Sequence, residues 1–365
     1  MHARDGLEPC AARGDKQAVS SEDTFPQATI IIVTFNSEKH FARLRAALYS
    51  QNAPYRLIVF DNGSAPERRP TADAFPAGAT IMQSEDNIGF AAANNRAAEG
   101  VETPWLALLN PDAYPEPDWL AQLLHAGARF KEAGAFSSTQ IMESDPARYD
   151  GLGDCYAPHG GNWRGGHRWA RSGYSSSEGE VFSACAAAAL YRTTAWREAR
   201  GFDERYFGYC EDLDLGFRLR LLGRKTIHVP DAVVRHVGGG SSARGSDFEC
   251  FHTTRNCVWT FVKDMPGWLF WLLAPAFTGF SIVRLLSASV RGNGGPTWRG
   301  LRAAIHGLPE TWRARSEIQM HRKAKASEIA AALTWSPFKL WRRAPDIRPI
   351  RDQSASAKAS ARKAQ

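Results

Sequence analysis

Short apolar runs alternate with amphipathic stretches through the first 130 residues. Four of the runs have the β-branched and aliphatic composition of strands buried on both faces, at 28–33, 55–60, 80–82 and 105–109. Apolar residues recur at helical spacing between and after these runs, at 37–49, 91–99 and 115–130. Strands that alternate with helices in this way predict an α/β fold with a mainly parallel central sheet.

The pattern changes after residue 150. Residues 151–180 are rich in Gly, Ser, Trp and Arg, which predicts a long loop, and long loops in compact domains tend to be functional or disordered. Periodic structure then returns with a predicted strand at 181–191, a helix at 212–222 and a strand at 225–229.

The C-terminal third contains an uncharged stretch of near-membrane length at 265–283. Pro266 and Pro275 interrupt it, and Trp268 and Trp271 suit a membrane–water interface. We expect helices that lie on the inner face of the membrane; a spanning helix and burial against the catalytic domain or a partner subunit are the alternatives. Residues 1–26 are expected to be a flexible leader and 351–365 a disordered basic tail.

Composition and charge narrow the class of protein. The 365 residues are 44% hydrophobic and 23% charged, as in ordinary globular proteins. The net charge of +7 is concentrated after Arg291, which favours an anionic partner, and the absence of a recognisable nucleic-acid module favours lipid over nucleic acid. The six cysteines form no CxxC pair and no secretory signal precedes them, so we expect a reducing cytoplasm. A zinc site is one hypothesis for Cys250, His252 and Cys257, but the usual ligand spacings are missing.

Polar side chains follow three of the predicted strands, where ligands bind in open α/β sheets. They are Thr34-Phe35-Asn36, Asp61-Asn62 and Asn110-Pro-Asp112. Asp112 offers the hard oxygen ligand that Mg²⁺ or Mn²⁺ prefers. An Asx turn before a helix explains the same residues equally well.

A second acidic cluster, Glu211-Asp212-Leu-Asp214, stands at the start of a predicted helix. Carboxylates there are stabilised by the helix dipole, and Asp212 and Asp214 project in different directions, which makes a chelating pair improbable. One acid that faces a cleft could instead act as a general base. His236, ahead of Gly238–240, is either structural or a ligand; the segment is not a Walker loop.

In order, these segments resemble the bacterial family 2 glycosyltransferases of GT-A fold, in particular the rhamnosyltransferase and galactofuranosyltransferase-like group. The likeness covers roughly residues 28–265. The matching segments are Ile32-Val-Thr-Phe-Asn36, Val59-Phe-Asp-Asn-Gly-Ser64, Asn87-Ile-Gly-Phe-Ala-Ala-Ala-Asn-Asn95, Leu109-Asn-Pro-Asp112, Ala187-Ala-Ala-Leu-Tyr-Arg192, Gly201-Phe-Asp-Glu204, Glu211-Asp-Leu-Asp-Leu215 and Arg235-His236.

The resemblance implies a role for each matched position. Asp212 would be the base that deprotonates the acceptor hydroxyl, and Asp112 and His236 would hold Mg²⁺ or Mn²⁺ on the donor diphosphate. Glu211, Asp214 and Trp163 would support the acceptor or the helix start. The donor nucleotide would contact Thr34, Phe35, Asn36, Asp61, Asn87, Gly89, Asn95 and Asn110.

The chain departs from the family pattern at two positions. Asn110 replaces the first acid of the metal motif, which leaves one carboxylate there, and Ala186 stands where relatives often have Gly. The first departure implies a modest affinity for the metal. The second could tighten the acceptor site, over which the segment 151–180 would form a lid with Trp163, His167 and Trp169.

The implied protein is a cytoplasmic, metal-dependent inverting glycosyltransferase, peripheral on the inner membrane face. It would transfer a sugar, rhamnose among the candidates, from a nucleoside-diphosphate sugar to a glycan or polyprenyl-diphosphate-linked glycan in cell-surface polysaccharide synthesis. Its GT-A domain would span 27–262 and its membrane-associated helical region 263–350; a homo-oligomer stays open. A catalytically silent scaffold and a nucleotidyltransferase are the alternatives. Asp112 and Asp212 argue against the scaffold, and the lack of a Gly- and Lys-rich phosphate loop argues against the nucleotidyltransferase.

Overall fold

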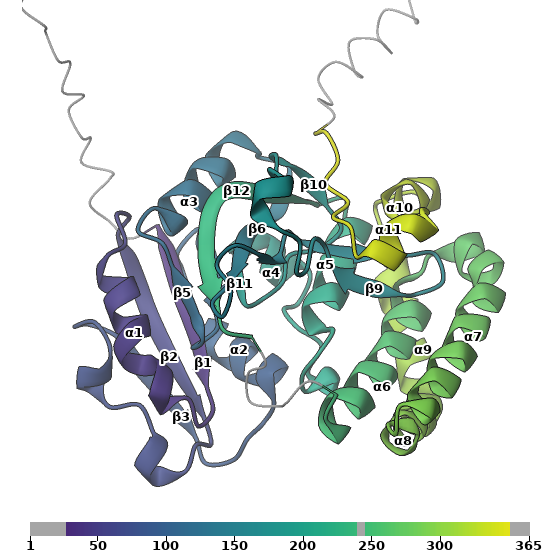
Figure 1. The fold of residues 1–365 in the computed structure, drawn as a ribbon, viewed down its shortest axis with the longest axis horizontal. Helices are drawn as coiled ribbons and strands as arrows, with labels where there is room; N and C mark the ends of the chain where they lie inside the picture. The colour runs from purple at the N-terminus through teal and green to yellow at the C-terminus, as the bar shows by residue number, and fades with distance from the viewer. Residues whose placement is uncertain (1–26, 239–244, 351–365) are drawn as a thin grey trace, which may run out of the picture.

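A computed structural model of the protein describes residues 27–238 and 245–350 (Figure 1). The expected leader, the expected basic tail and most of the glycine run after His236 lie outside these residues. The predicted strands are present as β1 Ala28–Thr34, β2 Tyr55–Asn62, β3 Thr80–Ser84 and β4 Trp105–Leu109. Every residue of β1 is buried, as its unbroken apolar run predicts.

These strands belong to one large mixed sheet, whose main path is β10-β12-β6-β11-β4-β1-β2-β3. Pairing is parallel from β4 through β1 and β2 to β3, and parallel again between β6 and β12. Strand β11 separates the two parallel groups because it runs antiparallel to both β4 and β6. The remaining members are β5 Ala113–Pro115, β6 Ala133–Met142, β7 Tyr149–Gly151, β10 Gly179–Val181, β11 Ala188–Arg192 and β12 Lys225–His236. The predicted α/β fold with a mainly parallel sheet is confirmed.

Helices cover both faces of the sheet. One core cluster joins Ile30 and Ile32 of β1 to α1 Glu38–Tyr49 and α3 Trp119–Arg129. The alternate residues of β1, Ile31 and Val33, pack in a second cluster with α2 Phe90–Ala98, α4 Thr193–Glu198 and α5 Glu211–Leu221. The two-residue period of a strand therefore divides the core into two apolar layers.

Three local predictions were wrong. The helix expected over 115–130 begins only at Trp119, because Ala113–Pro115 pairs instead with the end of β12. The strand expected over 181–191 is confined to Ala188–Arg192. The segment 151–180 is no open loop, since β8 Asp154–Tyr156 and β9 Asn162–Arg164 form a hairpin in it. Burial of Cys155, Tyr156 and Trp163 orders this hairpin.

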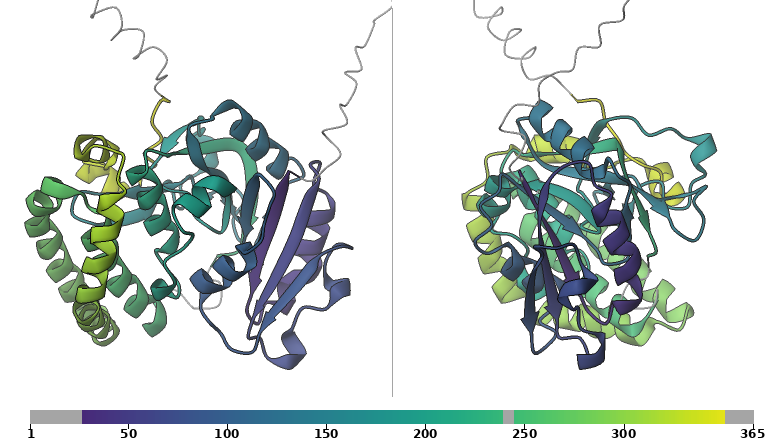
Figure 2. Two further views of the ribbon diagram at one scale, coloured as in Figure 1. Left: turned by 180° about the vertical axis from the view of Figure 1, so that it is seen from behind. Right: turned by 90° about the vertical axis from the view of Figure 1, so that its left-hand side faces the viewer.

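The C-terminal helices lie at the opposite end of the molecule from β1–β3, as Figure 2 shows, and their buried side chains form a third core. Helix α6 packs against α5, α8 and α9. Near its end, Lys263 forms buried ion pairs with Asp203 and Asp214, so this helix is joined to the catalytic half. The helices are α6 Asp247–Asp264, α7 Gly267–Val290, α8 Gly294–His306, α9 Leu308–Met320, α10 Ala326–Ala332 and α11 Pro337–Arg342.

Candidate active site

A cleft of about 880 Å³ opens at the carboxyl ends of β1, β2 and β4. Its walls come from segments far apart in the sequence: the ends of these strands, the β8–β9 hairpin, the segment 185–187, the start of α5, the end of β12 and the start of α6. Strand ends of a parallel sheet meet at one edge, which is why the polar residues that follow them gather here.

The side of the cleft next to β1 and β2 is lined by Phe35, Asn36, Asn62, Asn87 and Asn110. Asn62 donates a hydrogen bond from Nδ2 to Oδ1 of Asn87 at 3.0 Å and accepts one at Oδ1 from the backbone of Ile88, also at 3.0 Å. These bonds order the turn before α2. Asn62 was not among the predicted donor residues, although it follows Asp61 directly at the end of β2.

Four predicted donor residues stand behind this wall and do not line the cleft: Thr34, Asp61, Gly89 and Asn95. The buried carboxylate of Asp61 accepts hydrogen bonds from the Thr34 hydroxyl at 3.1 Å and from the Ser64 hydroxyl at 2.5 Å. Asn95 exchanges hydrogen bonds with the backbone of Phe202, each at 2.9 Å. In this structure these side chains organise the strand ends and the loop that follows α4.

Asp112 and His236, the two predicted metal ligands, lie together at the cleft. Because His236 pairs with Ala113 in the β5–β12 register, its Nε2 lies 3.5 Å from Oδ1 of Asp112. On the other side of the ring, Nδ1 is 2.7 Å from Oδ2 of Asp150. Burial opposes the charged ring, but hydrogen bonds with both carboxylates outweigh it and raise the pKa of His236.

Asp150 is the residue that sequence reasoning missed in this cluster. Its buried carboxylate also contacts Arg164 and His167, so that it joins β7, the hairpin and β12. Burial opposes its ionisation, yet the Arg164 charge and the bonds from both histidines hold the pKa of Asp150 far below its usual range. Tyr149-Asp-Gly151 carries no motif, so nothing in the sequence marks it.

The donor set of Asp112 and His236 fits a divalent cation. A metal-binding histidine usually has its second ring nitrogen bonded to a carboxylate, and Asp150 occupies that position. Within 27–238 and 245–350, no group of three or more His, Cys, Asp or Glu side chains is arranged to hold a metal ion. Cys250, His252 and Cys257 therefore do not form such a group in the described residues. A cation here would therefore depend on donor phosphate oxygens or water for its remaining ligands.

Asp212 faces the cleft from the first turn of α5. Its Oδ2 accepts a hydrogen bond from the backbone N–H of Ala186 at 3.0 Å, and its Oδ1 accepts one from Leu213 at 2.8 Å. The two backbone donors fix the direction of the carboxylate. Ala186, which stands where relatives often have Gly, therefore contacts Asp212 through its main chain.

The two acidic neighbours of Asp212, Asp214 and Glu211, lie in different environments. Asp214 is fully buried, pairs with Arg218 at 2.7 Å and accepts from the Tyr206 hydroxyl at 3.1 Å, so it stabilises the helix away from the cleft. Glu211 lines the cleft, and its buried Oε2 has no hydrogen-bond partner. Burial, together with the charge of Asp212, raises the pKa of Glu211 well above its usual range.

A further carboxyl group, Asp154, lines the cleft from β8. The Ser183 hydroxyl donates to its Oδ2 at 3.2 Å, and Arg164 stands opposite it in the hairpin register. Burial and the nearby charge of Asp212 raise the pKa of Asp154 to about 7. Sequence reasoning missed Asp154 and Arg164, and no motif marks either residue.

Trp163 lies at the cleft, but its role is mainly structural. The ring is buried beside Cys155 and Ala157, and its indole N–H donates to the carbonyl of Ala344 at 2.9 Å. The C-terminal segment thereby holds the hairpin against the cleft.

The mixed sheet, its two helical layers and the cleft at the strand ends define a GT-A-type glycosyltransferase fold. The crystal structure of GalNAc-T7 with UDP, GalNAc and Mn²⁺ shares this fold with a TM-score of 0.53 and 13% identity, over 66% of this chain and 48% of that chain. The profile of glycosyl transferase family 2 matches residues 29–196, so this part of the chain is a family 2 glycosyltransferase domain. The predicted family is confirmed.

The similarity to two proteins of Mycobacterium tuberculosis covers more of this chain than the family profile does. An N-acetylglucosaminyl-diphospho-decaprenol L-rhamnosyltransferase is 29% identical over 245 residues, which cover 59% of this chain and 77% of that protein. A pre-mycofactocin glycosyltransferase is also 29% identical, over 214 residues that cover 57% of this chain and 42% of that protein. The expected rhamnosyltransferase-like character of the chain agrees with the first relative.

Proposed function

We propose that this glycosyltransferase moves a sugar from a nucleoside-diphosphate sugar to a hydroxyl group of a polyprenyl-diphosphate-linked glycan, with inversion at the anomeric carbon. The observation that carries the proposal is the placement of Asp212, whose carboxylate is fixed by two backbone donors in the same cleft as Asp112 and His236. One wall then suits the donor, and the carboxylate opposite it suits the acceptor.

Different residues of the cleft would bind the nucleoside, hold the metal and accept the proton. The Asn-rich wall of Asn36, Asn62 and Asn87 binds the nucleoside through amide groups, which both donate and accept hydrogen bonds. Asp112 and His236 would hold Mg²⁺ or Mn²⁺, which would offset the charge that develops on the nucleoside diphosphate. Asp212 accepts the proton of the acceptor hydroxyl as its oxygen attacks the anomeric carbon opposite the leaving group.

Glu211, Asp154 and Arg164 supply polar groups beside Asp212 that suit the acceptor. Glu211 has a buried oxygen, Oε2, without a hydrogen-bond partner, and this oxygen could bond a sugar hydroxyl. Asp154 and Arg164 offer a carboxyl group and a guanidinium opposite each other on the hairpin. The mycobacterial rhamnosyltransferase is named for a decaprenol-diphosphate-linked acceptor, and this supports the same acceptor class here.

The helix α7 supports a position on the membrane surface. It is the one described helix long and apolar enough to cross a membrane, and only 17% of its most apolar stretch is buried. Leu269, Phe270 and Leu273 belong to the helical core, whereas Trp271 and Leu272 are 68% and 61% exposed. Because one face is already packed against the protein, we propose that α7 lies in the interface rather than spanning the bilayer.

Exposed basic side chains accompany this apolar surface. They are Arg291, Arg299, Arg302 and Arg313, which follow α7 or lie on α8 and α9. Attraction to anionic lipid on the inner leaflet would add about 1 kcal/mol for each basic residue close to the surface.

A thermal-shift titration with nucleotide sugars, with and without Mn²⁺, tests the donor and metal assignments. The cognate donor should stabilise the wild type by about 2.7 kcal/mol at 100 times its dissociation constant, since it binds only the native state. Mn²⁺ should strengthen that effect in the wild type and in Asp145→Ala, an exposed control, but not in Asp112→Ala. An equal response of all three proteins to Mn²⁺ would exclude Asp112 as a ligand.

The acceptor assignment needs a transfer assay. With the donor that the titration identifies, label should enter an organic-extractable polyprenyl-diphosphate glycan. Label that enters only a water-soluble glycan would contradict the lipid-linked acceptor while leaving the donor assignment intact.

A further inference from the structure

Two cysteine side chains meet directly beneath the catalytic helix. Cys210 is the residue before α5, two positions ahead of Asp212, and Cys257 lies in the middle of α6. Their sulfur atoms are 3.8 Å apart, which is van der Waals contact for two thiols. Cys210 also lines the large cleft, whereas Cys257 is buried.

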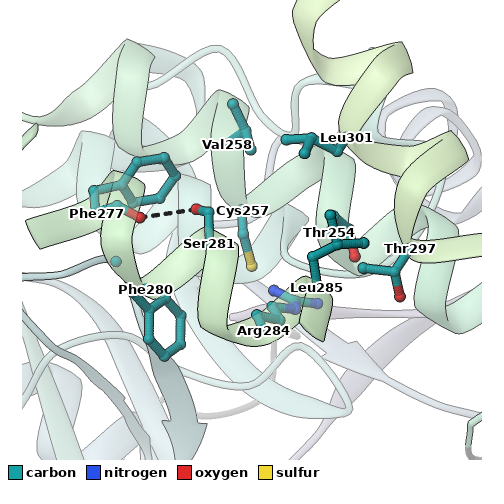
Figure 3. A pocket seen from close by; sticks show the side chains of 11 residues that line it. Thr254, Cys257, Val258, Phe277, Phe280, Ser281, Arg284, Leu285, Thr297 and Leu301 are labelled. Atoms are coloured by element: carbon teal, nitrogen blue, oxygen red, sulfur yellow. Dashed lines mark hydrogen bonds between the residues drawn. The ribbon is translucent and has the colours of Figure 1, made fainter. Parts of the chain in front are cut away.

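The surroundings of Cys257 favour its thiolate. Asn162 donates from Nδ2 to the sulfur at 3.2 Å. Arg284 reaches the same sulfur from α7, as Figure 3 shows, and it is the only charged residue between 265 and 290. The hydrogen bond with Cys210, followed by the charge and hydrogen bond of Arg284, outweighs burial and lowers the pKa of Cys257 to about 5.

The other buried thiols differ from this one. Burial raises the pKa of both Cys155 and Cys185, so these thiols stay protonated and unreactive at neutral pH. Burial likewise raises the pKa of Cys250, which lies seven residues before Cys257 on α6. The hydrogen bond with Cys257, together with burial, raises the pKa of Cys210 as well, so among the cysteines that the structure describes only Cys257 favours the thiolate.

The size of the neighbouring cavity limits which oxidant reaches this sulfur. Cys257, Arg284, Phe277 and Phe280 are among the side chains around a space of about 20 Å³ (Figure 3). A cavity of this volume holds about one water-sized molecule. A small peroxide is compatible with it, whereas a bulky disulfide such as oxidised glutathione is not.

We propose that Cys210 and Cys257 form a peroxide-sensitive pair that closes to a disulfide and switches off the transferase. The Cys257 thiolate attacks one oxygen of hydrogen peroxide, the O–O bond breaks, and the departing hydroxide takes a proton to become water. The Cys210 sulfur then attacks the sulfenic sulfur of Cys257; its S–O bond breaks, and the second hydroxide leaves as water with the Cys210 proton. Two thiols and one peroxide thus give one disulfide and two waters.

The position of Cys210 explains why closure would stop the reaction. Phe207, Tyr209 and Cys210 all have positive φ angles, of 64°, 68° and 66°. The buried Asn256 side chain holds this segment by donating to the carbonyls of Tyr206, Gly208 and Tyr209. A strained segment of this kind persists only while its surroundings hold it.

A disulfide brings the two sulfur atoms to about 2.0 Å, so the gap must close by nearly half. This movement pulls on the residue two positions before Asp212, whose carboxylate depends on the backbone N–H of Ala186. Misplacement of a catalytic group by about 1 Å can cost on the order of 100-fold in rate, and a loss of that size is expected on oxidation.

The test is peroxide treatment of the purified full-length protein, followed by peptide mapping without reduction. The expected result is a Cys210–Cys257 crosslink, an activity loss of about 100-fold, and recovery of both on reduction with dithiothreitol. Cys210→Ala should stop at a sulfenic acid on Cys257 that dimedone traps, and Cys250→Ala, the matched control on α6, should respond like the wild type. The mapping does not depend on the acceptor or on transfer, so it stands even if the proposed function fails.

Two results would overturn the proposal. One is a treated protein whose peptides show Cys250 oxidised while Cys210 and Cys257 stay unlinked. The other is inactivation of Cys257→Ala that dithiothreitol reverses to the same extent as in the wild type, because reversible loss would then arise elsewhere.

Discussion

The isosteric substitution Asp150→Asn isolates the contribution of the carboxylate behind His236. It removes the negative charge that Nδ1 of His236 meets at 2.7 Å while preserving the shape of the side chain. A hydrogen bond to a charged group contributes about 1.5–3 kcal/mol, and loss of such a partner weakens metal binding by about 10- to 100-fold. Each factor of ten corresponds to about 1.4 kcal/mol, so the two estimates agree.

The assay is sugar transfer measured across a Mn²⁺ titration. The half-saturating Mn²⁺ concentration of Asp150→Asn should rise by about 10- to 100-fold, with turnover at saturating Mn²⁺ nearly restored. Asp145→Asn is the matched control, since Asp145 pairs only at the surface with Arg148 and both side chains are about half exposed. Thermal melts separate this effect from unfolding, because Arg164 also loses a charged partner. An unchanged half-saturating concentration in a folded Asp150→Asn protein would refute the reasoning.

Three further predictions concern stability and location. The pKa of Asp154 in the folded protein is raised to about 7, so its ionisation lowers the free energy of unfolding as pH rises from about 4 to 7. In chemical denaturation, Asp154→Asn should therefore be as stable as the wild type at pH 4. At pH 8 it should be more stable, by at most about 4 kcal/mol. Gly89→Ala should lose about 1–3 kcal/mol in the same experiment, since φ is +89° and a Cβ atom would meet the Phe207 ring at 2.7 Å; unchanged stability would mean that the loop relaxes freely. Trp271→Ser with Leu272→Ser should reduce flotation with anionic vesicles, and full retention of binding would remove α7 as the membrane contact.

Surface substitutions test the membrane contact better than removal of the C-terminal helices. A chain that ends at residue 262 would lose Lys263, whose ammonium group pairs with Asp203 at 2.6 Å and with buried Asp214. Asp203 and Asp214 would keep Arg205 and Arg218, but loss of one partner from a buried group of charges is strongly destabilising. Altered partitioning of such a truncated chain would therefore report unfolding as readily as loss of an anchor.

The sequence predicted the first half of the fold well because its strands are continuous apolar runs. β4 was predicted at its observed bounds, and β1 and β2 extend only one or two residues further. Prediction failed where long-range pairing decides structure. Ala113–Pro115 becomes a strand because the end of β12 runs beside it, and nothing local to those residues reveals that partner.

The candidate site divides in the same way. Asp112, Asp212 and His236 stand next to recognisable strand or helix ends, and the structure brings all three to the cleft. Asp150 and Asp154 flank a glycine-rich stretch without a motif, and their importance arises from partners 86 and 29 residues away, His236 and Ser183. Such contacts depend on packing and cannot be obtained from local pattern.

The central claim is that Asp212 takes the proton of the acceptor hydroxyl. The most direct measurement compares wild type with Asp212→Asn in single-turnover transfer and, on the same samples, in donor binding by calorimetry. The amide keeps the shape of the side chain and an oxygen for one backbone donor but cannot act as a base, so transfer should fall by about 10²- to 10⁴-fold while the donor dissociation constant changes little. Transfer by Asp212→Asn at the wild-type rate, with donor binding intact, would contradict the account.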